Sequence, residues 1–193
     1  GPHHQHWFSF RLDMMVDGPQ NSVYEVDSAA VPLGPDNPHG NAWVTRSTLL
    51  AREAEAQRDL DPLAGRYWLI VNASATNALG EPTAYKLVPG DNVRALAHPE
   101  SSIARRAGFI AHHLWATPYE ASERYAAGDY PNQHPGGAGL PAWVQANHGL
   151  ANTNVVLWYS LGVHHIVRPE EWPVAPVSYA GFSLKPVGFF DGN

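Results

Sequence analysis

The sequence has no cysteine, few charges of either sign and no long apolar run, and each absence excludes a class of protein. Without cysteine, the 193 residues can form neither disulfides nor Cys-type zinc sites. Lys and Arg number 12 against 18 Asp and Glu, and the net charge of -6 argues against nucleic acid or a membrane as partner. The longest apolar run, residues 155–162, is much shorter than the roughly 20 residues of a membrane span.

Turn-forming and aromatic residues are abundant instead. The chain has 17 Pro, 17 Gly and 7 Trp, a composition that favours an all-β fold with long loops. Its length fits one domain, and no internal boundary is visible. Six segments read as strands: 4–17, 20–27, 67–74, 83–90, 108–119 and 152–169. Residues 42–59 have the composition of a helix but could also be a polar strand, and the Pro-punctuated segment 170–190 should run along an edge or surface.

A candidate metal site begins with two histidines in the first strand. His4 and His6 stand at positions i and i+2, so both side chains point to one face and can reach one ion. Phe8, Phe10 and Leu12 share that face, and this apolar row predicts that the histidine pair is buried.

The third ligand must come from another strand, and residues 155–167 are the best source. His165 shares its parity with the apolar residues of this strand, whereas His164 points the other way. Both faces are apolar, so parity favours His165 only weakly. Three imidazoles suit Cu(II) or Zn(II), with copper preferring a tetragonal arrangement completed by water. The plainer interpretation is structural histidines, and it applies to His112, His113 and His134, which have no ligand spacing.

Several stretches, taken together and in order along the chain, resemble motifs of the copper amine oxidases. The form of these motifs is most similar to that of the bacterial enzymes. The stretches are HQHWFSFRLDMMVDG (4–18), AYKLVPG (84–90), RRAGF (105–109), HLWATPY (113–119), AAGDYPNQ (126–133), GLPAWV (139–144), NTNVVLWYSLGVHHIVRPEEWPVAP (152–176) and GFSLKPVGFFD (181–191).

The resemblance implies a fold, an activity and a set of ligands. The fold is part of an antiparallel β-sandwich, with residues 1–193 as the C-terminal portion of the catalytic domain. The activity is oxidative deamination of primary amines by O2, giving aldehyde, ammonia and hydrogen peroxide. His4, His6 and His165 become the ligands of copper(II). The resemblance further implies a homodimer with a hairpin arm within residues 67–90, and a cytoplasmic bacterial location is expected.

The other parts of that active site are expected upstream of this chain. The family makes topaquinone from a tyrosine in an Asn-Tyr-Asp/Glu motif, and none of the eight tyrosines here follows an Asn. The family's catalytic Asp also precedes the His-x-His pair. No catalytic residue is therefore assigned within these 193 residues, which are interpreted as a fragment, inactive alone and dependent on the remainder of the same polypeptide.

A second divalent site, calcium-like in the family, would use Asp13, the Met14 carbonyl, Asn154 and the Val155 carbonyl. Met15 and Asn154 stand where carboxylates are usual, and a hard cation prefers charged oxygen ligands, so two substitutions weaken this site. Ala175 likewise stands near the copper where the family often has methionine.

Two other functions compete with this interpretation. A cupin-like metal enzyme also has a His-x-His strand, but it needs a Glu a few residues later, and the first Glu here is Glu25. A non-catalytic β-sandwich binding module would use the histidines only structurally. Stoichiometric Cu(II) binding separates this module from the oxidase.

Overall fold

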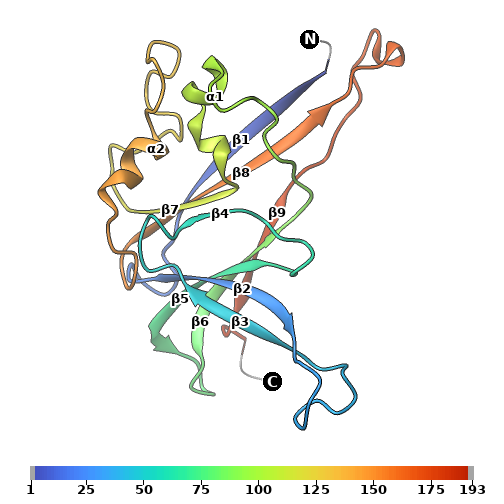
Figure 1. The fold of residues 1–193 in the computed structure, drawn as a ribbon. Coiled ribbons are helices and arrows are strands. Elements are labelled where there is room, and N and C mark those ends of the chain that lie inside the picture. The colour runs from blue at the N-terminus through green and yellow to red at the C-terminus, as the bar shows by residue number, and fades with distance from the viewer. Residues whose placement is uncertain (1–2, 191–193) are drawn as a thin grey trace.

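The computed structural model describes residues 3–190, which form two antiparallel β-sheets (Figure 1). The first sheet has the strand order β1 (His4–Asp13), β8 (Val155–His165), β7 (Leu114–Pro118) and β4 (Gln57–Arg58). The second has the order β3 (Trp43–Leu49), β2 (Ser22–Ala30), β5 (Tyr67–Thr76), β6 (Pro82–Pro89) and β9 (Phe182–Val187). The expected all-β sandwich class is confirmed.

Helices are few and short, and they lie in the connections. They are α1 (Ser102–Arg106), α2 (Leu140–Trp143) and three 3-10 helices at Gly108–Ala111, Val144–Ala146 and Pro169–Glu171. Among residues 3–190, no helix is long and apolar enough to cross a membrane.

The main core lies between the two sheets. Leu157, Tyr159 and Leu161 of β8 pack there with residues of the second sheet such as Trp68 and Ile70. Burial of these large side chains contributes about 1.5–3 kcal/mol each, which explains why both sheets are rich in β-branched and aromatic residues. The alternate residues of β8 are also buried, because a second apolar cluster covers the outer face of the first sheet. Its members are Trp115, Ala126, Leu140, Val144, Val156 and Trp158.

The two histidine-bearing strands reach beyond this core. β1 and β8 run together as a two-stranded ribbon toward the N-terminus (Figure 1). Phe182 of the edge strand β9 packs against Phe10 of β1 and Tyr159 of β8, with ring centroids 5.3 and 4.9 Å apart. Beyond this contact the inner face of the ribbon is open, and Phe8 is 54% exposed.

Most of the expected strands form, and the hairpin expected between residues 67 and 90 is present as β5 and β6. Its turn is organised by Asn77, whose side-chain oxygen accepts hydrogen bonds from the N–H groups of Leu79 and Glu81 at 3.0 and 2.9 Å. The Pro-rich segment 170–190 supplies the edge strand β9, as expected for a chain with so many missing N–H donors.

Residues 42–59, left open between helix and polar strand, contain strands and no helix: β3 pairs along its length with β2, so sheet pairing overrides the helix-like composition. One segment differs from the sequence-based expectation. The strand expected over 108–119 begins only at Leu114. The preceding 3-10 helix places the Phe109 carbonyl 2.9 Å from the indole nitrogen of Trp115, which donates a hydrogen bond to it.

Candidate metal centre

The ladder between β1 and β8 brings the three predicted ligands to one place. His4 pairs directly with His165, and His6 pairs with Val163. Opposite residues of an antiparallel pair share a face, so the three imidazoles project from the same side of the ribbon. Gln5 and His164 form the intervening pair and face the other way, which confirms the parity that favoured residue 165 over 164.

The ring nitrogens converge closely. One nitrogen from each of His4, His6 and His165 lies within 4.8 Å of the other two. The Nδ1 atom of His165 is 3.2 Å from Nε2 of His4, and the ring centroids are 4.7 Å (His4–His6), 4.6 Å (His4–His165) and 5.9 Å (His6–His165) apart. Within residues 3–190, this is the sole group of three or more His, Asp or Glu side chains with metal-binding spacing.

This donor set fits a copper or zinc ion. Imidazole nitrogens bound at about 2.0 Å to one ion lie about 2.8–4 Å apart, depending on the angle between them. The 3.2 Å separation lies inside that range, and the 4.8 Å limit exceeds it by an amount that small ring rotations can close. Three neutral imidazoles with open positions suit Cu(II), whereas calcium and magnesium prefer oxygen ligands.

The expectation that the histidine face is buried is wrong for this structure. His4, His6, Phe8 and Phe10 are exposed, and His165 is half-buried. The apolar row of Phe8, Phe10 and Leu12 lies on the face of β1 that turns toward the second sheet. The second sheet covers that face only as far as Phe182, so the histidines lie beyond the buried part.

A shallow cavity opens over the histidines. Besides the three rings, its lining comprises Phe8, Val163, Ala175, Pro176 and Ser178. The last three belong to the extended segment that follows the 3-10 helix Pro169–Glu171, so this segment forms one wall of the site. Ala175, which was expected near the copper, lies in this wall.

The residues predicted to form a second divalent site are also brought together. Asp13 ends β1 opposite Val156, and the N–H of Met14 donates to the Val155 carbonyl at 3.1 Å. The side-chain oxygen of Asn154 is buried without a hydrogen-bond partner among the described residues. The Val155 carbonyl thus already accepts one hydrogen bond, and Met15 is an exposed thioether that offers no oxygen ligand.

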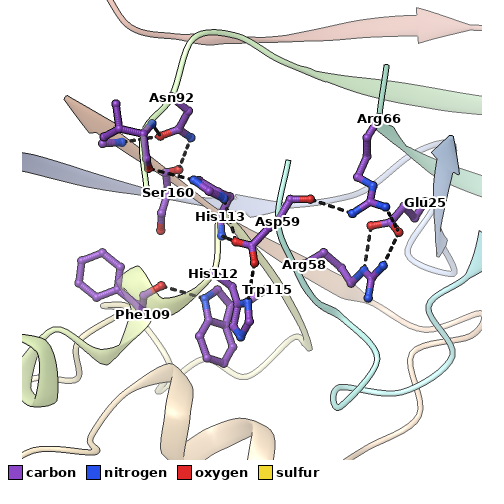
Figure 2. Close-up of polar contacts among 12 residues, drawn as sticks. Glu25, Arg58, Asp59, Arg66, Asn92, Phe109, His112, His113, Trp115 and Ser160 are labelled. Atoms are coloured by element: carbon purple, nitrogen blue, oxygen red, sulfur yellow. Dashed lines mark hydrogen bonds and ion pairs between the residues drawn. The ribbon is translucent and has the colours of Figure 1, made fainter. Parts of the chain in front are cut away.

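Two further histidines belong to a structural cluster around Asp59, just after β4 (Figure 2). One oxygen of Asp59 lies 3.2 Å from Nδ1 of His112, and the other lies 2.8 Å from Nδ1 of His113. The second ring nitrogen of His113 is 3.0 Å from the Val93 carbonyl. Both histidines thus have hydrogen-bond partners within the fold, as structural histidines do.

The loop that carries Val93 also contacts both strands of the metal site. The Asn92 side chain donates to the Ser160 carbonyl at 2.8 Å and accepts from the Gly162 N–H at 2.7 Å, as Figure 2 shows in part. The side chain of Gln5, between the two ligand histidines, donates to the Arg94 carbonyl at 2.8 Å. One loop therefore holds β1 and β8 from the face opposite the histidines.

Comparison with known proteins agrees with this geometry. A model of the copper amine oxidase enzyme domain matches residues 1–193, the whole chain.

The chain belongs to the copper amine oxidase family.

Other copper amine oxidases are similar over the whole length of the chain. Histamine oxidase from Arthrobacter globiformis is 53% identical over 192 residues, which cover 100% of the chain and 28% of that protein. Primary amine oxidase from Arthrobacter sp. (strain P1) is 41% identical over 193 residues, covering 100% of the chain and 29% of that protein. The crystal structure of a copper-containing benzylamine oxidase from Hansenula polymorpha matches with a TM-score of 0.92 and 35% identity, covering 99% of the chain and 30% of that structure.

This copper amine oxidase chain thus spans less than a third of the length of these relatives. Because the chain belongs to the copper amine oxidase family, the cupin-like interpretation is wrong. Sequence reasoning missed two features near the candidate metal site. One is the 92–96 loop, which Gln5 of β1 contacts and whose Asn92 bonds to β8, and the other is Glu171, which contacts His165. Nothing in the sequence signals the loop contacts. Pro169, a favoured residue for starting a turn, signals that the chain bends back after β8 and could have drawn attention to Glu171.

Proposed function

We propose that the complete protein catalyses copper- and quinone-dependent oxidative deamination of primary amines, and that this chain supplies the three copper ligands. The observation that carries the proposal is the convergence of one nitrogen each from His4, His6 and His165 within 4.8 Å. Family membership supports amine oxidation in general. The copper role of these particular residues rests on their geometry and donor chemistry.

The chain's own residues have separate tasks in this proposal. His4, His6 and His165 bind the metal through neutral ring nitrogens. Phe8 and Val163 line the cavity with apolar surface, which limits the water around the metal. Copper, when bound at these imidazoles, supplies one-electron chemistry with O2 in the oxidation of the amine to aldehyde, ammonia and hydrogen peroxide.

Other parts of the polypeptide complete the site in this proposal. The topaquinone-forming tyrosine and the carboxylate base come from those parts, because no Asn-Tyr motif occurs in these 193 residues. Residues 1–193 then form part of the catalytic domain. The proposal further includes a homodimer with an arm built on the β5–β6 hairpin, and a cytoplasmic location.

Ligand substitution in the complete protein tests the proposal. Each of His4→Ala, His6→Ala and His165→Ala removes one imidazole, and we expect copper content, measured by mass spectrometry of metals, to fall from one ion per chain to well below half. His164→Ala is the matched control, because it removes the neighbouring imidazole from the opposite face. Its copper content and its EPR spectrum with nitrogen hyperfine structure should equal those of the wild type.

A second measurement addresses the reaction itself. Peroxide release with a set of primary amines, together with labelling by a carbonyl reagent such as phenylhydrazine, reports the oxidase activity and its quinone. Stoichiometric copper without either signal would leave a metal-binding protein that is not an oxidase. Wild-type protein that binds no copper at the three histidines would overturn the proposal and favour a non-catalytic binding module.

We also propose a weak calcium site at Asp13, the Met14 and Val155 carbonyls and Asn154. The buried, unpartnered side-chain oxygen of Asn154 supports it, because such an oxygen needs a partner. Calorimetric titration with Ca²⁺ tests the site: wild type should bind with millimolar affinity, since only Asp13 carries a charge, and Asp13→Asn should abolish binding. No heat of binding with wild-type protein would contradict the site.

A further inference from the structure

A carboxylate contacts the copper ligand His165 on the side of the ring that faces away from the other histidines. Oε2 of Glu171 lies 2.7 Å from Nε2 of His165. The opposite ring nitrogen, Nδ1, points toward Nε2 of His4 at 3.2 Å. His165 therefore lies between a carboxylate and the candidate metal position, with one nitrogen committed to each.

The position of Glu171 follows from the turn after β8. Pro169 begins a 3-10 helix that ends at Glu171, and the N–H of Glu171 donates to the Arg168 carbonyl at 3.1 Å. The Glu171 carboxylate also forms a hydrogen bond with the Arg168 backbone, so main chain and side chain both contribute to this turn. The turn brings the carboxylate, six residues further along the chain, back onto the His165 ring, where the Glu171 side chain is only 10% exposed.

The contact selects one tautomer of His165. A carboxylate accepts hydrogen bonds, so Nε2 carries the proton and donates it to Glu171. The lone pair of the neutral ring is then on Nδ1, the nitrogen that faces His4. Carboxylates that accept a hydrogen bond from a metal-bound imidazole fix its orientation and increase its strength as a ligand.

We propose that Glu171 is a positioning residue for the copper site, which holds His165 as the Nδ1-binding tautomer and aims its ring at the metal. This inference rests on the proposed copper function. The contact has a second consequence, because the chain from Trp172 onward carries Ala175, Pro176 and Ser178 over the site. By holding the turn to the His165 ring, Glu171 also anchors the start of this wall.

A purely structural role for the Glu171 side chain is less well supported by its other contacts. Its one further ion pair in the described chain is to Arg168, where Nε is 3.8 Å from Oε1, and Arg168 has a 64% exposed side chain. Such an exposed pair contributes little to stability. The carboxylate also forms a hydrogen bond with the Arg168 backbone. The bond to His165, at 2.7 Å, is the one contact of this side chain that reaches a candidate metal ligand.

The test compares three variants of the complete protein, prepared without metal and titrated with Cu(II) against a competing chelator. Glu171→Leu removes the acceptor. Glu171→Gln keeps an oxygen acceptor of the same shape but removes the charge. Glu170→Leu is the matched control, because it makes the same change one residue earlier, on the same 3-10 helix, at an exposed position.

We expect Glu171→Leu to weaken Cu(II) binding by about 10–100-fold, Glu171→Gln to weaken it less, and Glu170→Leu to leave it unchanged. Pulsed EPR gives the second readout. The remote nitrogen of His165, Nε2, should show an altered quadrupole coupling in Glu171→Gln, which retains the side-chain volume and should fold as the wild type does. A merely structural role for Glu171 would not change this coupling.

Equal affinity and an unchanged remote-nitrogen signal in both Glu171 variants would overturn the inference and leave the copper site itself intact. If wild-type protein bound no copper at the histidines, the result would contradict the proposed function itself, before any effect of Glu171 is considered. The two failures are therefore distinguishable within the same titration.

Discussion

The side-chain oxygen of Gln5 accepts a hydrogen bond from the backbone N–H of Leu96 at 2.9 Å, across 91 positions of sequence. The same side chain donates to the Arg94 carbonyl at 2.8 Å, so it forms two backbone contacts with one loop. Gln5 lies between His4 and His6 but points to the opposite face of β1. The strand that carries two of the proposed ligands is thereby held, on its opposite face, by a loop that does not line the cavity over the histidines.

Replacement of Gln5 with Ala should release this loop. We expect a loss of about 1–2 kcal/mol in the free energy of unfolding, because two neutral hydrogen bonds disappear. Hydrogen exchange of the Leu96 amide should accelerate, and it provides the specific measurement. Gln20→Ala, at an exposed position in the turn before β2, is the control and should change neither quantity. Unchanged protection of Leu96 in Gln5→Ala would show that the loop is held by other contacts.

A methyl group at Gly162 should strain the same region. A Cβ atom there would lie 2.7 Å from Val93 Cγ2 and 2.8 Å from two ring carbons of Trp7. Both neighbours would have to move, and overpacking of this kind costs about 1–3 kcal/mol. Chemical denaturation of Gly162→Ala should show this loss.

Gly149→Ala is a suitable comparison for Gly162→Ala, because no heavy atom lies within 4 Å of its added Cβ. Equal stability of Gly162→Ala and wild type would mean that Trp7 and Val93 can move apart at little cost.

The Asp59 cluster predicts a pH dependence of stability. Partial burial favours the neutral acid, but hydrogen bonds from His112 and His113 outweigh it and hold the pKa of Asp59 well below its ordinary value. The folded protein thus prefers the ionised carboxylate. This stabilisation is complete above the unfolded pKa of about 4 and is lost as the pH falls below it toward the lower, folded pKa.

Asp59→Asn should therefore lower the melting temperature at pH 7 and have a smaller effect at about pH 3. The difference in free energy of unfolding at pH 7 should be about 1 kcal/mol, since the side chain is half exposed and water weakens the interaction. Melting curves between pH 3 and 7 measure it, with Asp36→Asn at an exposed loop position as control. A difference that stays constant across this range would contradict the assignment.

The buried Glu25 should be the most sensitive carboxylate of the second sheet. Its side chain is only 5% exposed and accepts hydrogen bonds from Arg58 Nε at 2.8 Å and from the Trp68 indole at 3.2 Å (the ion pairs with Arg58 and Arg66 are drawn in Figure 2). Glu25→Gln keeps the shape but leaves both guanidinium groups without this counter-charge.

We expect Glu25→Gln to cost about 2–4 kcal/mol, less than the upper values for buried pairs because Arg58 can turn toward water. Urea denaturation gives the number, and Glu100→Gln, at an exposed position, should be neutral. A loss of less than about 0.5 kcal/mol in the free energy of unfolding, which is ordinary for a surface substitution, would show that the charge of Glu25 contributes little to stability.

The local patterns in the sequence predicted those parts of the fold that depend on alternation and turn chemistry. The i, i+2 spacing of His4 and His6 selected one face of β1, whereas parity favoured His165 on β8 only weakly. The ladder brings these three residues together. The β5–β6 turn follows the same local rules, because Asn77 forms an Asx contact and Gly80 adopts a positive φ of 81°, which these residue types favour.

What could not be predicted depends on contacts between distant segments. The choice between helix and polar strand for residues 42–59 stayed open, because it depends on the pairing of β3 with β2, and a single sequence does not show that pairing. Burial of the histidine face was predicted from its apolar row, but how far the second sheet covers that face depends on where β9 lies. The contact of Glu171 with His165 needed the turn geometry, which composition alone does not give.

If the proposed copper site is correct, the direct pairing of His4 with His165 makes copper uptake sensitive to the alignment of β1 and β8. If β8 slipped by one residue, His164 would face His4 and the imidazole of residue 165 would turn to the far side of the sheet. A slip of two residues that moved His165 away from His6 would restore the side but separate the rings by roughly 7 Å or more along the strand. Under the proposed copper role, metal content would therefore report the fraction of molecules in which β1 and β8 align so that the three imidazoles meet.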